Sequence, residues 1–111
     1  MDHYLIWVDL VPGTKDLDFV DAVETWLGHL KEKGTLHGFT VQRRKFGFGP
    51  TGLGEWFIDI VFDNLAQMDE AFEIAATRTP DVEAIHRAVF EKVTNYKSGL
   101  YRDFPDPFRQ R

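Results

Sequence analysis

Two segments of the chain alternate strictly between two faces, and each presents large apolar residues on both of them. They are residues 3–10 and residues 55–63. A period of two indicates β-strands, and strands with two apolar faces are typical of the covered centre of a sheet. The wholly apolar faces consist of Tyr4, Ile6, Val8 and Leu10 in the first segment and of Trp56, Ile58, Ile60 and Phe62 in the second.

The other segments show helical spacing or shorter strand patterns, separated by glycine and proline. Apolar residues from Val82 to Tyr96 recur at intervals of three, four, four and three, which predicts a helix. In order, the sequence predicts a strand at 3–10, a helix from Thr14 or Asp16 to Gly34, a strand at 36–46, a turn at 47–54, a strand at 55–63, a helix capped by Asn64 and Gln67, a helix from Pro80 to about Tyr96, and a short strand at 99–104.

This order is β-α-β-β-α-β with an extra helix before the last strand, which is the split βαβ pattern of ferredoxin-like folds. We therefore predict an α+β fold and a single domain over residues 1–111. In this arrangement the first and third strands lie in the centre of the sheet. The helices cover one sheet face, so the wholly apolar strand faces should point toward them.

The opposite sheet face then lacks a cover. It carries Leu5, Trp7, Phe57 and Val61, and a solvated face does not usually present such residues in its central strands. All the predicted helices are already used on the first face. We therefore predict a homodimer packed through this second face, since a two-fold dimer is the commonest way to hide such a surface.

The strand opening His3-Tyr4-Leu5-Ile6-Trp7-Val8 and the closing Gly99-Leu100-Tyr101-Arg102-Asp103-Phe104 resemble the dimeric α/β-barrel superfamily. The resemblance is architectural, covers about the whole chain, and points to an uncharacterised bacterial family with this fold. It implies two ferredoxin-like subunits packed sheet on sheet. The superfamily includes cofactor-free monooxygenases, chlorite-dismutase-like haem proteins, muconolactone isomerases and stress-responsive barrel proteins, and no catalytic signature of any of these is present in this chain.

Composition argues against several classes of function. The formal net charge of −5 is opposite to the balance expected of a nucleic-acid-binding protein. The chain has no cysteine, which excludes thiol catalysis and thiolate metal sites. It shows no long apolar run and no signal-peptide pattern, so we expect a cytoplasmic protein without membrane contact.

Glu83 and His86 lie one helical turn apart, which we interpret as a solvated helix face rather than a metal site.

The second sheet face holds the candidate site residues. His3, Asp9 and Asp59 are able to move protons and are the candidate catalytic residues. Alternatively, the aspartates are structural and pair with Arg44 or Arg102. Trp7, Phe57 and Arg44 are the candidate ligand-binding residues, because rings form apolar walls and a guanidinium binds carboxylates well.

Residues 47–52 match the pattern G-x-G-x-x-G, but the next element is a strand, whereas dinucleotide binding requires a helix there. We therefore expect a mobile hairpin loop and neither a cofactor nor a metal.

Two functions remain open. One is binding of a small apolar or aromatic ligand, between helices and sheet or at the mouth of the dimer barrel, with cofactor-free oxygenase- or isomerase-like chemistry. The other is a non-catalytic dimeric interaction module.

Overall fold

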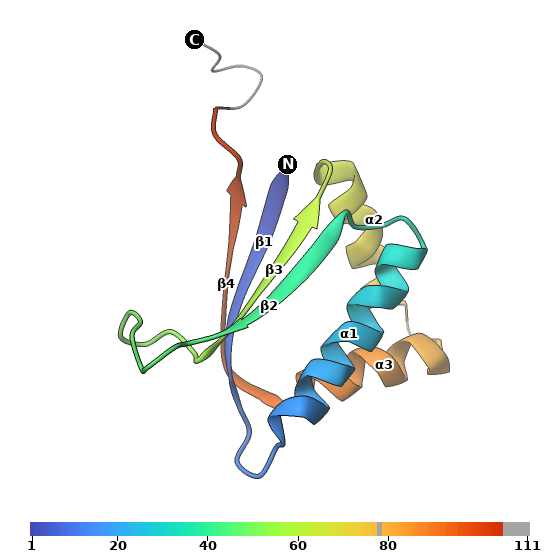
Figure 1. Cartoon of the computed structure of the whole chain (residues 1–111). Helices are drawn as coiled ribbons and strands as arrows, with labels where there is room; N and C mark the ends of the chain where they lie inside the picture. The colour runs from blue at the N-terminus through green and yellow to red at the C-terminus, as the bar shows by residue number, and fades with distance from the viewer. Residues whose placement is uncertain (78, 106–111) are drawn as a thin grey trace.

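One four-stranded antiparallel sheet forms the frame of the protein (Figure 1). The computed structural model describes residues 1–77 and 79–105. The strands lie in the order β2-β3-β1-β4, so the two strands predicted to be central are central. Their bounds are β1 (Asp2–Leu10), β2 (Gly38–Arg43), β3 (Trp56–Phe62) and β4 (Val93–Arg102).

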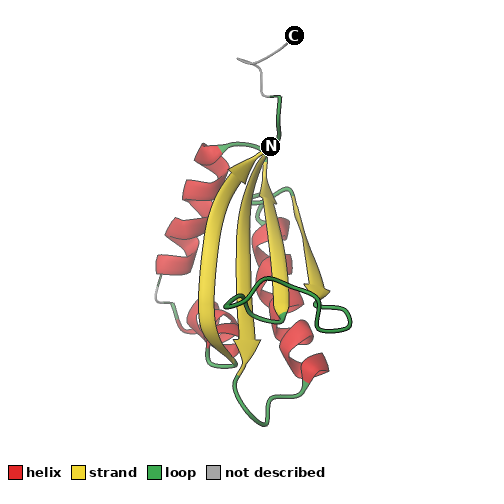
Figure 2. Ribbon diagram, turned by 90° about the vertical axis from the view of Figure 1, so that its left-hand side faces the viewer, coloured by secondary structure: helices red, strands yellow, loops and turns green. Residues whose placement is uncertain are grey.

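Three helices lie on one face of this sheet, which leaves the other face toward the viewer in Figure 2. They are α1 (Asp16–Glu32), α2 (Leu65–Ala76) and α3 (Pro80–Phe90). The predicted capping pair at the start of α2 is confirmed. The Asn64 side chain accepts a hydrogen bond from the Gln67 backbone N–H, and the Gln67 side chain accepts one from the Asp63 backbone N–H. Among the described residues, no helix is both long and apolar enough to cross a membrane.

The core forms between the helices and the two apolar strand faces, as the alternation predicts. The register places Tyr4 opposite Ile60, Ile6 opposite Ile58 and Val8 opposite Trp56. Helix α1 contributes five buried side chains at helical spacing, namely Phe19, Val23, Trp26, Leu27 and Leu30. Burial of these apolar surfaces is the main stabilising contribution to the fold.

The prediction for the end of the chain is partly wrong. Helix α3 ends at Phe90, and β4 already begins at Val93, so the predicted helix to Tyr96 is too long and the predicted strand at 99–104 starts too late. The reason is a β-bulge in β4. Trp7 pairs with Lys97, but Asp9 pairs with Thr94, so β4 carries one extra residue between these pairs.

This bulge places Val93 and Tyr96 on the same face of the sheet although they are three residues apart. A regular strand would put them on opposite faces. Asn95, between them, has a left-handed backbone with a φ of 53°, which asparagine tolerates better than most residues. The interval of three that indicates a helix therefore arises here from an irregular strand.

The predicted strand at 36–46 is shorter in the structure, where β2 spans Gly38–Arg43. Leu36 is buried in the core ahead of β2, and the chain after β2 enters a loop in which Phe46 has a left-handed φ of 57°. The loop that follows leads into strand β3, and no helix begins there. In Figures 1 and 2 this loop projects on the side of the sheet away from the helices.

Candidate functional site

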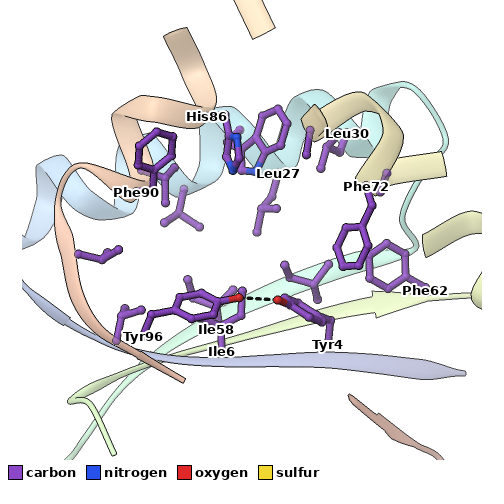
Figure 3. Close-up of a pocket in the computed structure, with 18 of the residues that line it drawn as sticks. Tyr4, Ile6, Leu27, Leu30, Ile58, Phe62, Phe72, His86, Phe90 and Tyr96 are labelled. Atoms are coloured by element: carbon purple, nitrogen blue, oxygen red, sulfur yellow. Dashed lines mark hydrogen bonds between the residues drawn. The ribbon is translucent and has the colours of Figure 1, made fainter. Parts of the chain in front are cut away.

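A cavity of about 440 Å³ lies between the sheet and the helices (Figure 3). Its floor is formed by side chains of β1, β3 and β4, such as Tyr4, Ile58 and Val93. Its roof and walls come from α1, α2 and α3, with Leu27 and His86 among them. The volume falls in the range of small-molecule sites in proteins.

Two tyrosines provide the main polar feature of the cavity floor. The hydroxyl of Tyr4 on β1 forms a hydrogen bond with the hydroxyl of Tyr96 on β4, shown as the dashed line in Figure 3. Burial, together with this hydrogen bond, raises the pKa of Tyr96 to about 12, against the smaller opposing effect of a hydrogen bond with Ser98. The Tyr96 hydroxyl therefore stays protonated over the whole physiological pH range.

An aromatic cluster forms part of the opposite wall. The rings of Trp26 and His86 stack at 4.6 Å with an interplanar angle of 24°, and Phe90 contacts His86 edge-on at 5.2 Å. Burial lowers the pKa of His86, so its imidazole is neutral at pH 7. The interpretation of His86 as part of a solvated face is therefore wrong. Its position four residues after Val82 and three before Val89, on the apolar face of α3, is the signal that identifies it.

Two of the predicted catalytic residues meet on the opposite sheet face. Nδ1 of His3 lies 3.0 Å from Oδ1 of Asp59, and Nε2 lies 2.8 Å from Oδ1 of Asp103. The hydrogen bond with Asp59 is the largest cause of a raised pKa of His3, and Asp103 adds to it. Asp103 is absent from the predicted site. Its place at the end of the strand antiparallel to β1, beside the first residues of β1, is the signal that could have found it.

Asp9 lies apart from this pair, six residues further along β1 than His3. Its carboxylate accepts hydrogen bonds from the Glu55 backbone N–H at 2.9 Å and from Nδ2 of Asn95 at 3.0 Å. The Glu55 N–H is the largest cause of the lowered pKa of Asp9. These contacts tie the loop before β3 to the bulge of β4.

The three predicted ligand-binding residues lie together under the 44–55 loop. The rings of Trp7 and Phe57 are 5.3 Å apart, and with Arg44 they help to line a shallow hollow of about 190 Å³. Nη2 of Arg44 donates to the backbone oxygens of Leu53 at 2.7 Å and Gly54 at 3.3 Å. The guanidinium therefore supports the loop. Trp7 is four residues from His3, on the order of 13 Å along a strand, so this hollow and the His3–Asp59 pair are separate.

Within the described part of the chain, no group of three or more histidine or acidic side chains is placed to hold a metal ion. The candidate features are therefore the apolar cavity on the helix side and, on the opposite face, the His3 cluster and the Trp7 hollow. The cavity is larger than the Trp7 hollow and has a more hydrophobic lining.

Comparison with known proteins gives a family and a fold. The model of a family of unknown function (DUF6614) matches residues 1–111. No curated protein matches the sequence.

Solved structures match over nearly the whole chain. A variant of SnoaB, a cofactor-independent oxygenase from Streptomyces nogalater, matches with a TM-score of 0.69 and 10% identity over 95% of this chain and 97% of that one. The Arabidopsis thaliana protein At3g17210 gives a TM-score of 0.74 with 6% identity over 96% and 98%. A dimeric ferredoxin-like protein of unknown function from Jannaschia sp. CCS1 gives 0.67 with 10% identity over 92% and 98%. At these identities the likeness concerns the fold.

Proposed function

This chain belongs to the DUF6614 family and has a ferredoxin-like fold, and from that premise we propose that it binds a small apolar or aromatic molecule in the cavity between helices and sheet. The observation that carries the proposal is the cavity itself, about 440 Å³ with an almost wholly apolar lining. Sites for small molecules are concave and mostly apolar, with a few placed polar groups.

Exposed rings in the lining support the same proposal. Phe72, Phe90 and Tyr96 line the cavity, yet these residues are 45%, 51% and 51% exposed. Large rings gathered at an opening are a common mark of a binding site. A flat molecule seated among them would remove apolar surface from water, which contributes roughly 25 cal/mol per Å².

We further propose that any reaction in this cavity is of the cofactor-free kind, oxygenase- or isomerase-like. SnoaB, which shares the fold, is described as a cofactor-independent oxygenase. In such chemistry the substrate supplies the reactive electrons, and the protein supplies an apolar enclosure and proton-transfer groups. His3 and Asp59, which were predicted as catalytic residues, contact each other on the opposite sheet face, so they would serve proton transfer there and not in this cavity.

Filling the cavity tests the proposal. Ala75 on α2 lines the cavity, whereas Ala66 on the same helix is exposed and does not line it. We expect naphthalene to bind the parent protein in calorimetric titration. Ala75→Trp should weaken that binding by about tenfold or more, which corresponds to about 1.4 kcal/mol, and Ala66→Trp should leave it unchanged.

Absence of naphthalene binding to the parent protein would contradict ligand binding and favour the non-catalytic dimeric module. Equal loss in both tryptophan variants would show that the effect does not come from the cavity.

A further inference from the structure

The cavity offers a ligand very few polar groups. Among the described residues that line it, only Tyr4, Trp26, His86 and Tyr96 have a polar side-chain atom, and none has a side chain that is charged at neutral pH. An ionised ligand would lose its hydration there without meeting an opposite charge, which is costly. The lining therefore favours neutral molecules.

The hydroxyl pair of Tyr4 and Tyr96 still has one proton to give. A phenol has one O–H donor, and within the pair one hydroxyl donates and the other accepts. Whichever tyrosine donates to the other, the accepting hydroxyl keeps its own proton for a third oxygen. The hydrogen bond with Ser98 lowers the pKa of Tyr96, which is the effect of a donor to the Tyr96 oxygen, so Ser98 leaves that proton free. A hydroxyl that already accepts a hydrogen bond is also a stronger donor.

Packing fixes the position of this pair. The Tyr4 ring contacts Phe72 edge-on, with ring centroids 5.4 Å apart at 81°. Tyr96 is directed into the cavity from the bulged part of β4. Figure 3 shows both hydroxyls at the floor, with His86 and Phe90 on the opposite side of the cavity. A flat ring between floor and roof would place an oxygen of its own near the hydroxyls.

We propose that the Tyr4–Tyr96 hydroxyl pair is the specificity element of this cavity and selects neutral ring compounds that carry a carbonyl oxygen. This inference rests on the proposed function, because it names the class of ligand for the same cavity. The pair donates its free proton to the carbonyl oxygen, while the apolar walls hold the ring. The high pKa of Tyr96 keeps this donor available in alkaline solution as well.

A comparison of two neutral probes and one anion tests the inference. The probes are naphthalene, its cyclic ketone relative α-tetralone, and the naphthoate anion, each titrated by calorimetry. We expect the parent protein to prefer the ketone over naphthalene by about three- to tenfold, which is the range of one hydrogen bond. Naphthoate should bind more weakly than either.

The double variant Tyr4→Phe/Tyr96→Phe keeps both rings and removes both hydroxyls. It should lose the preference for the ketone while its affinity for naphthalene stays close to that of the parent, which also shows that the cavity is intact. Tyr101→Phe is the matched control, because Tyr101 pairs with His3 and belongs to the opposite sheet face. It should keep the preference.

A ketone preference that survives in the double variant would overturn the inference and assign the donor to Trp26 or His86. Tight binding of naphthoate would overturn it as well. Failure of the proposed function looks different, because in that case naphthalene itself does not bind the parent protein.

Discussion

At the residue scale, the His3 side chain contacts two carboxylates on the open sheet face. One ring nitrogen contacts Asp59 on β3, and the other contacts Asp103, which directly follows β4. The N-terminal amine also lies 3.4 Å from Asp103. An imidazolium satisfies both carboxylates at once, because both of its nitrogens donate. His3 therefore joins β1 to β3 and to the end of β4, and Asp103 in turn contacts the N-terminus.

The raised pKa of His3 has a consequence for stability. The protonated state is favoured by folding, so the stabilisation is fully present below the ordinary value of 6.5 and is lost as pH rises through the higher folded pKa. We expect His3→Gln to lower the free energy of unfolding by up to about 1 kcal/mol near pH 5.5 and by less near pH 8.5. Urea unfolding at fixed protein concentration measures both values. If the parent and His3→Gln differ in free energy of unfolding by the same amount at both pH values, the ionic contacts of His3 contribute nothing to stability.

At the element scale, the bulge of β4 decides how much of the site the sequence can predict. Simple alternation places His3 with Asp59 and Trp7 with Phe57 on one face, and the register confirms this. Tyr96 could not be placed in this way, because the extra residue breaks the alternation and imitates helical spacing. The site residue that matters most for the cavity floor therefore lies where the local pattern is misleading.

The left-handed backbone of Asn95 gives a test of this element. A β-branched residue adopts a positive φ only with strain, so Asn95→Val should destabilise the protein by about 1–2 kcal/mol more than Asn95→Gly. Both variants lose the hydrogen bond to Asp9, so the glycine variant is the control for that loss. Equal free energies of unfolding in thermal or urea denaturation would mean that the bulge relaxes without cost.

At the scale of the whole molecule, the sheet has one covered and one open face. The open face presents Trp7 and Phe57 in contact with each other, and no described helix packs on it. The matching protein from Jannaschia is described as dimeric. We propose that two copies of this chain pack through these faces, as the sequence predicts.

Replacing Trp7 by Asp should disrupt this dimer, because a carboxylate buried in an interface without a partner is costly. We expect light scattering of the parent protein at micromolar concentration to give twice the chain mass of 12.9 kDa, and Trp7→Asp to give the mass of one chain. Leu17→Asp is the control, since Leu17 is 73% exposed on α1, on the helix side. A monomeric parent protein, or a dimeric Trp7→Asp variant, would place the interface elsewhere or remove it.

At the bulge, two residues of β4, Asn95 and Tyr96, lie opposite one residue of β1, Val8. In a regular antiparallel pair, one residue lies opposite one. Tyr96 extends into the cavity. The side-chain amide of Asn95 donates hydrogen bonds to Asp9 and to the backbone oxygen of Gly52 in the 44–55 loop. Asn95 is the supernumerary residue. Deleting Asn95 alone would restore regular pairing and would still direct Tyr96 into the cavity. The 44–55 loop would lose its hydrogen bond with Asn95. A chain shortened by Tyr96 would instead turn the Asn95 amide into the cavity and would lose the same loop contact. Deleting Asn95 therefore changes only the outer side of the sheet at this position, whereas deleting Tyr96 changes both sides.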